Sequence, residues 1–236
     1  NAVLDGFTVT GGCSTNSPTA GEIQRGAGMY VSNCSPTIIR CRFTANASTN
    51  GGGLFLRNSS SRVEACEFDG NYAAREGGGF ATYYHGGPIL DCTFSNNAAG
   101  YSGGGFACRY QLGSPVISNC LFVANTKTTY GAGMRLENWR GTVVGCTFVN
   151  NSGYTGGGFY TWYSAPLITN CLFTTNQAST GGGAGGYFVY NDGSRTSLVV
   201  NCTFSGNRGG KGGAITTLAR VTVKDCRLVG NGTDVL

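Results

Sequence analysis

Histidine, charge and long apolar runs are scarce in this sequence of 236 residues. His85 is the only histidine, and 11% of the residues are charged. A zinc site needs cysteine and histidine ligands at close spacing, and no such set occurs, so we expect neither a metal site nor a cofactor. No run of about 18 apolar residues occurs, which argues against a membrane-spanning helix. The lack of helical periodicity argues against any long helix.

Carboxylates are also few, and this restricts the enzymes to consider. The chain has eleven, whereas glycoside hydrolysis needs two within about 5–10 Å of each other. Calcium-assisted cleavage of polysaccharides needs several on one face, together with a basic side chain. We expect a protein that is not an enzyme, with a polysaccharide lyase or hydrolase as the alternative. One weak acidic cluster, otherwise read as solvated surface acids, consists of Glu64, Glu67, Asp69 and Asp91.

Basic residues are scattered along the chain. The 16 lysines and arginines leave a net charge of +5. A nucleic-acid partner requires such residues to gather on one face or along one element. We therefore expect no nucleic-acid partner, and we interpret the net charge as that of a mildly basic surface.

A repeat accounts for most of the chain. Eight cysteines recur at intervals of 24 to 31 residues, with an isoleucine or valine three positions before each and an asparagine five positions after. A phenylalanine, or a leucine in the last copy, lies two positions after each cysteine. Periods in this range are typical of repeat architectures. The cysteines are Cys41, Cys66, Cys92, Cys120, Cys146, Cys171, Cys202 and Cys226, and the asparagines are Asn46, Asn71, Asn97, Asn125, Asn151, Asn176, Asn207 and Asn231.

Each repeat predicts one coil of a β-solenoid. The cysteine and the phenylalanine are two positions apart, so both point to one face of a strand. Bend-forming residues such as Asp91 and Asn119 precede the cysteine, and the asparagine and the glycine run mark further corners. We expect an all-β protein of about nine coils, each with three short strands. Residues 1–236 form one domain, with an irregular first coil at 1–32 and regular coils at 33–236.

The eight repeated cysteines are expected to form a buried, reduced ladder. An inward-facing thiol behaves as a small apolar side chain, and together with the asparagines these cysteines are assigned a structural role. Cys13, Cys34 and Cys108 lie outside this ladder. Cys13 and Cys34 belong to the irregular first coils, and a disulfide between them is left open.

Two short motifs resemble those of a known repeat family. Residues 94–97 read Phe-Ser-Asn-Asn, which fits Phe-x-x-Asn, and residues 212–215 read Gly-Gly-Ala-Ile. Both motifs are similar to the repeats of the polymorphic outer membrane proteins first described in chlamydiae. Elsewhere the second motif is mostly Gly-Gly-Gly-Phe or Gly-Gly-Gly-Leu, which departs from that family. The resemblance covers essentially residues 33–236. It implies a right-handed parallel β-helix, export to the cell surface or beyond, and a role in adhesion or surface structure.

The strand after each glycine run carries the candidate binding face. We expect its fourth residue and the next one to point outward, where aromatic and arginine side chains suit sugar rings or another protein. Packing of these side chains between coils is the alternative. The fourth position is assigned to Tyr83, Arg109, Glu137, Trp162 and Tyr190, and the next position to Tyr84, Tyr110 and Tyr163.

The repeat therefore predicts a scaffold rather than a reaction. We expect a non-catalytic, extracellular structural or adhesive module. A carbohydrate-binding or carbohydrate-active β-helix is the alternative. Neither end of the sequence looks capped, as a solenoid requires, so a piece of a longer protein and end-to-end assembly into filaments are both open. The expected partners are other copies of the chain, or a surface glycan or protein.

Overall fold

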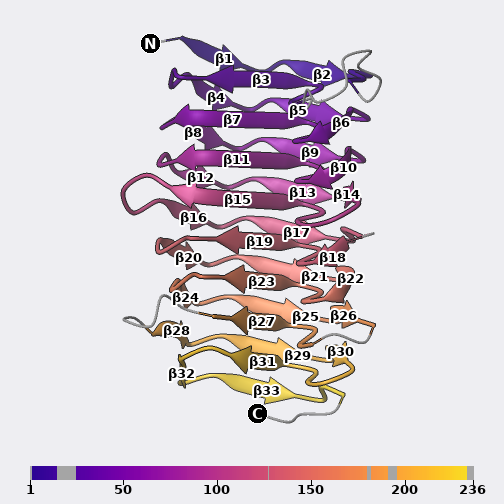
Figure 1. Ribbon diagram of the computed structural model, residues 1–236, viewed down its shortest axis with the longest axis vertical. Coiled ribbons are helices and arrows are strands. Elements are labelled where there is room, and N and C mark those ends of the chain that lie inside the picture. Colours follow the sequence, from indigo (N-terminus) through magenta and orange to yellow (C-terminus); the bar gives the residue numbers. More distant parts are fainter. Residues whose placement is uncertain (1, 15–24, 127, 180–181, 191–195, 233–236) are drawn as a thin grey trace.

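The computed structural model of the chain is a parallel β-solenoid (Figure 1). It describes all residues except 1, 15–24, 127, 180–181, 191–195 and 233–236. The described residues form 33 strands and no helix, so none of them provides a helix that could cross a membrane. Strands of successive coils stack in one direction along the long axis, and the two ends of the chain lie at opposite ends of the stack.

Two sheets of nine strands run the length of the stack, one before and one after the repeated cysteine. In spatial order, sheet A contains β1 (Val3–Asp5), β4 (Thr37–Ile39), β8 (Arg62–Glu64), β12 (Ile89–Leu90), β16 (Val116–Ser118), β20 (Thr142–Val144), β24 (Leu167–Thr169), β28 (Ser197–Val200) and β32 (Val221–Lys224). Sheet B contains β2 (Thr8–Thr10), β5 (Arg42–Thr44), β9 (Glu67–Asp69), β13 (Thr93–Ser95), β17 (Leu121–Val123), β21 (Thr147–Val149), β25 (Leu172–Thr174), β29 (Thr203–Ser205) and β33 (Arg227–Val229).

The remaining strands lie before and after the glycine runs. The short strands before the runs form two small sheets, which together we call sheet C. The first contains β6 (Ala47–Asn50), β10 (Tyr72–Glu76) and β14 (Ala98–Ala99), and the second contains β18 (Thr128–Tyr130), β22 (Ser152–Thr155), β26 (Gln177–Ala178) and β30 (Arg208–Gly209). Sheet D, after the runs, contains β3 (Met29–Ser32), β7 (Leu54–Ser59), β11 (Phe80–His85), β15 (Phe106–Gln111), β19 (Met134–Glu137), β23 (Phe159–Trp162), β27 (Gly186–Val189) and β31 (Ile215–Leu218).

Two details of the predicted coil are wrong. Most coils carry four strands rather than three, because the chain stays extended between the asparagine and the glycine run and pairs there with its neighbours. The expected nine coils are slightly too many. Seven coils, from β4 to β31, contain all four strands, whereas the first lacks a described sheet C strand and the last contributes only β32 and β33.

The core is a set of ladders with one residue of each kind per coil. Phe94 and Phe122 stack with ring centroids 4.7 Å apart and planes 1° from parallel, and both are fully buried. The Cys66 thiol donates to the carbonyl oxygens of Glu64 at 3.2 Å and Ile38 at 3.6 Å. A buried thiol therefore has an acceptor in each coil, and its sulfur fills space beside the rings.

The repeated asparagine is a buried strut between coils. In Asn97 the amide Nδ2 donates to the Phe68 carbonyl oxygen at 2.8 Å, and the backbone N and Nδ2 both donate to Asn125 Oδ1 at 3.1 Å. The asparagine itself was predicted to make the corner. Instead, the residue before it adopts the left-handed backbone, as at Ala45 with φ 53° and Asn96 with φ 55°. This frees the asparagine side chain to point inward.

The cysteines outside the ladder occupy different places. Cys108 points inward in β15, between Thr82 and Leu136 of the adjacent coils, and burial raises the pKa of its thiol to about 12. Cys13 and Cys34 are exposed and are not joined by a disulfide. Cys13 lies beside Ala47 at the sheet C corner, whereas Cys34 follows β3 at the other end of the coil.

Candidate functional site

The outer face of sheet D collects the candidate residues. From β7 to β27, the first and third residues of each strand, such as Phe80 and Thr82, are buried, and alternation places the second and fourth on the other face. That outer face is largely covered, because side chains from the sheet C corner reach over it. Glu76 contacts Arg109, and the ring of Tyr101 lies under the guanidinium of Arg135.

The register of sheet D places most residues of the predicted binding face side by side, but the predicted position of Tyr190 is wrong. Tyr83, Arg109 and Glu137 are neighbours in successive strands, and Trp162 follows Glu137. The next residue in this row is Val189, not Tyr190. The glycine-rich segment of that coil starts the strand at Gly186, so Tyr190 takes the position that follows the strand.

A cluster of four charges lies at the centre of this face. The Arg109 guanidinium bridges the two carboxylates, with Nη2 at 3.0 Å from Glu76 Oε1 and Nε at 2.9 Å from Glu137 Oε2. Arg135 bridges the same pair through Nη1 at 3.3 Å and Nη2 at 2.5 Å. Arg135 Nη1 also donates to Ser102 Oγ at 3.1 Å. The two positive and two negative charges cancel, so the cluster as a whole is neutral.

Three of the four side chains are largely buried and that of Arg109 is 25% exposed, although Arg109 and Glu137 were expected to point outward. The side chains of Glu76 and Arg135 are 1% and 6% exposed, and that of Glu137 is 11% exposed. The Tyr83 hydroxyl donates to Glu76 Oε2 at 2.8 Å. Burial, reinforced by the Glu76 carboxylate, raises the pKa of Tyr83 to about 12. Ionic groups at this depth require mutual pairing, because each loses its hydration.

An aromatic cleft adjoins the charge cluster. It has a volume of about 210 Å³. The rings of Tyr101 and Tyr130 meet edge to face at 5.3 Å, and Tyr130 lies 4.9 Å from Tyr160. Its lining consists of Tyr101, Arg109, Tyr130, Arg135, Glu137, Tyr160 and Trp162. Aromatic walls with a few convergent polar groups are the usual composition of a small-molecule site.

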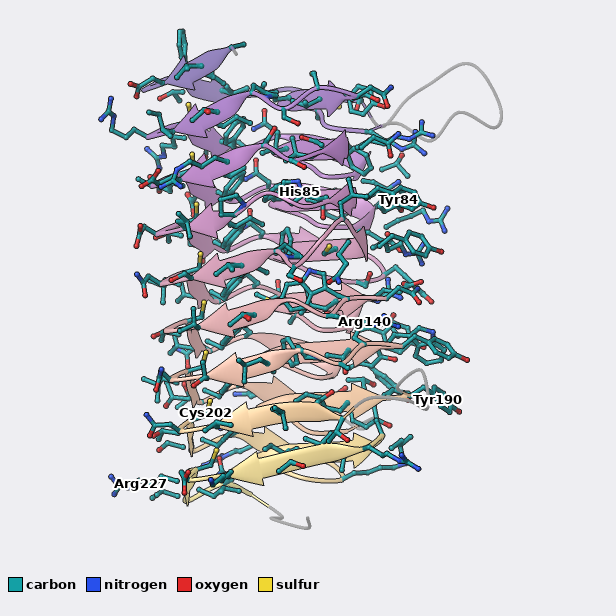
Figure 2. All side chains as sticks on the ribbon, turned by 90° about the vertical axis from the view of Figure 1, so that its left-hand side faces the viewer. Tyr84, His85, Arg140, Tyr190, Cys202 and Arg227 are labelled. Carbon is teal, nitrogen blue, oxygen red and sulfur yellow. The ribbon has the colours of Figure 1, made fainter. Side chains whose placement is uncertain are left out.

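A ridge of exposed tyrosines lies at the ends of the sheet D strands, within β11 and β15 and directly after β23 and β27. Tyr84 stacks on Tyr110 with centroids 4.9 Å apart, and Tyr163 stacks on Tyr190 at 5.7 Å. All four are between 39% and 50% exposed, and all four have a left-handed backbone. Figure 2 shows Tyr84 and Tyr190 on the same edge, projecting from the ribbon. We call these four residues the tyrosine ridge.

Asn138 interrupts the tyrosine ridge between its two stacked pairs. It has the same left-handed backbone as the tyrosines and borders a hollow of about 350 Å³. Gln111 stabilises the rim, since its Nε2 donates to the Gly113 carbonyl oxygen at 2.9 Å and its Oε1 accepts from the Arg140 backbone N–H. The hollow is lined by Gln111, Gly113, Asn138, Arg140 and Tyr163.

The acidic residues predicted as a weak cluster lie elsewhere, on sheets A and B. Glu64 pairs with Arg62 at 2.6 Å and Glu67 pairs with Arg42 at 3.3 Å, both at exposed positions. Asp69 accepts from the Ser95 hydroxyl at 2.7 Å, and Asp91 Oδ1 accepts from Asn119 Nδ2 at 3.2 Å. No group of three or more potential metal ligands occurs among the described residues.

The only histidine of the sequence, His85, is buried. His85 lies at the end of β11, and its Nδ1 is 2.9 Å from the Ser59 carbonyl oxygen. Burial lowers the pKa of the imidazole to about 4. The ring is therefore neutral near pH 7, and Figure 2 shows it within the coil rather than on the ridge.

Sequence reasoning missed half of the charge cluster. A usable signal exists, because Glu76, Ser102 and Tyr130 each precede the first glycine of a run and are paired with one another. Arg135 and Tyr160 share the second position of sheet D strands. The residue before the glycine run and the second residue of the sheet D strand lie on the same face as the fourth residue of that strand. Side chains from these three positions line most of the cleft.

The comparisons with known proteins give one match. A family model described as a right-handed β-helix region matches residues 4–148 and 126–235. No curated protein and no solved structure matches. The predicted fold class, an all-β right-handed parallel β-helix, is thereby confirmed.

Proposed function

Because the chain belongs to the right-handed β-helix family, we propose that it is a rigid, non-catalytic module that binds carbohydrate on the outer face of sheet D. The site consists of the tyrosine ridge, the hollow at Asn138 and the aromatic cleft. Its role is adhesion to a surface glycan, and its place is outside the cell. The module's similarity to the chlamydial outer membrane repeats, through Phe-x-x-Asn at 94–97, supports this location.

The exposed stacking of the tyrosine ridge carries this proposal. Stacked pairs bury part of each ring in a neighbour, yet Tyr84 and Tyr163 remain 43% and 46% exposed. A tyrosine offers a flat apolar face and a hydroxyl at small cost in side-chain entropy. The stacked coils keep the four rings in one row, which suits an extended chain of sugar rings better than a compact ligand.

The carboxylates favour binding over catalysis. Glu76 and Glu137 are the only acids in the site described above, and both accept from the same two arginines. A general acid or base must exchange a proton with a substrate within hydrogen-bond reach. Glu76, with a side chain that is 1% exposed, lacks such access. The acids Glu64 and Glu67, which were candidates for catalysis, are exposed and paired with arginines on another face.

Asparagine substitutions on the tyrosine ridge test this function. Asn138 occupies the same corner with the same backbone, so Tyr110→Asn and Tyr163→Asn preserve the fold. A glycan array probed with the parent chain selects the ligand, and calorimetry gives its Kd. Each lost ring is worth about 0.5–1.5 kcal/mol, so we expect the double variant to bind about tenfold more weakly.

Tyr154→Asn is the matched control for the ridge variants. Tyr154 is 53% exposed but belongs to β22 of sheet C, so its loss leaves affinity unchanged. Equal affinity of the parent and the double variant would contradict the proposal, as would an array without any bound glycan. End-to-end assembly stays a prediction, which sedimentation velocity of the same samples tests.

A further inference from the structure

We infer that the aromatic cleft on sheet D is a subsite that holds one uncharged pyranose unit of the bound glycan. This inference rests on the proposed function and names the class of sugar. The cleft encloses about 210 Å³, below the range of about 300–1,000 Å³ for drug-sized ligands. One ring therefore fits inside, and the rest of the glycan must lie on the neighbouring surface.

The charges around the cleft select against an ionised sugar. Arg109 and Arg135, the two arginines that line the cleft, each already pair with Glu76 and Glu137, so an anionic sugar would compete with these carboxylates for both guanidiniums. A cation would compete for the Tyr101 ring with the Arg135 guanidinium, which lies 5.7 Å from the ring centre. The paired charges also cancel, so a neutral occupant disturbs the cluster least.

The remaining hydrogen-bonding groups suit hydroxyls. Arg135 is 5% exposed, and among the described residues its Nε has no hydrogen-bond partner. A buried donor without a partner is costly, and an oxygen from a ligand relieves that cost. Glu137 receives both arginines on Oε2, and a carboxylate has further lone pairs to accept from a donor. A hydroxyl both donates and accepts, so neighbouring sugar hydroxyls match this donor and acceptor.

Trp162 joins the cleft to the tyrosine ridge. It lines the cleft, and its ring also lies edge to face with Tyr163 at 5.5 Å and with Tyr190 at 5.2 Å. One oligosaccharide can therefore place a ring in the cleft while its following units lie along Tyr163 and Tyr190. The two surfaces form one continuous binding path from the cleft to the corner of sheet D.

A change at the rim of the cleft tests the inference. Tyr101→Leu removes an aromatic wall while leaving the paired charges and the tyrosine ridge in place. Tyr72→Leu is the matched control, because Tyr72 has the same 41% exposure but belongs to β10 of sheet C. The probes are cellohexaose, maltohexaose, xylohexaose and mannohexaose as neutral chains, and a hexagalacturonate as the charged one. Binding is measured by calorimetry.

We expect a neutral hexaose to bind at least tenfold more tightly than hexagalacturonate. We also expect Tyr101→Leu to weaken the neutral chain about fivefold, with Tyr72→Leu unchanged. Tighter binding of hexagalacturonate than of the neutral chains overturns the cleft subsite. Full affinity in both Tyr101→Leu and Trp162→Leu, with weaker binding by the tyrosine ridge variant, also overturns it. Either result leaves the proposed function standing. If the tyrosine ridge variant instead binds the glycan as tightly as the parent chain, the proposed function is overturned. If Tyr101→Leu fails to fold, Tyr130→Leu replaces it, because Tyr130 lines the cleft and packs on Tyr101 and Tyr160.

Discussion

Replacement of Asn176 by alanine is expected to lower the free energy of unfolding by about 3 kcal/mol. Its Nδ2 donates to the Phe148 carbonyl oxygen at 2.9 Å and to Asn207 Oδ1 at 3.0 Å. Its Oδ1 accepts from Asn151, from the backbone N at 3.1 Å and from the side-chain Nδ2 at 3.0 Å. Asn176 is fully buried. Alanine leaves buried polar groups without partners, and each costs about 1–3 kcal/mol.

The adjacent residue supplies the control for this prediction. Gln177→Ala also removes a side-chain amide, but Gln177 is exposed on β26, so we expect a change within about 0.5 kcal/mol. Urea unfolding, followed by circular dichroism, gives the free energy of unfolding of both variants. Equal slopes of that free energy against urea concentration would show that both variants expose the same surface area on unfolding. Equal midpoints for the two variants would show that the asparagine ladder does not stabilise the solenoid.

Glu76→Gln is expected to destabilise the chain by about 3–5 kcal/mol. The change removes one negative charge from a buried cluster and leaves Arg109 and Arg135 to share Glu137. Breaking a buried ion pair by removing one partner costs about this amount, because the other charge stays desolvated. Glutamine keeps only one acceptor oxygen, so the Tyr83 hydroxyl, now 2.8 Å from Glu76 Oε2, and the two arginines would compete for it.

An exposed ion pair is the control for Glu76. Glu64→Gln disrupts the pair with Arg62, whose side chain is 45% exposed, and such pairs contribute about 0–1 kcal/mol. Thermal unfolding of both variants at equal protein concentration gives the comparison. A loss of stability for Glu76→Gln no greater than that for Glu64→Gln would mean that the four charges are solvated, and it would remove the physical basis for a neutral cleft.

The repeat made most of the fold predictable. A cysteine and a phenylalanine two positions later indicate one inward face, and this spacing recurs from Cys41 to Cys202, with a leucine at the second position in the last copy. The asparagine five positions after the cysteine was assigned to a corner, so its inward side chain was not predicted. The strand of sheet C was not predictable in the same way. Segments such as Ala98–Ala99 are too short and too varied to show an alternating pattern, and pairing with the neighbouring coils is what makes them strands.

The candidate site was predictable only in part, because alternation tells which face a residue points to but not what covers that face. Tyr83 and Glu137 do point away from the core, yet Glu76 contacts Tyr83, and Arg109 and Arg135 contact Glu137. The register of Tyr190 depends on the glycine-rich stretch of the longest repeat, so the spacing in the other repeats does not determine it. In contrast, Tyr84 and Tyr110 are 43% and 39% exposed in the part of the chain that the structure describes, as the outward prediction expected.

Affinity electrophoresis of the parent chain in gels that contain neutral polysaccharides tests the central claim most directly. The same gel track, recovered and analysed by mass spectrometry, gives the length of the glycan chains after contact with the protein. We predict that at least one neutral polysaccharide retards the protein and that its chain length is unchanged. Unretarded migration in every polysaccharide, or shortened glycan chains, would contradict a non-catalytic carbohydrate-binding module.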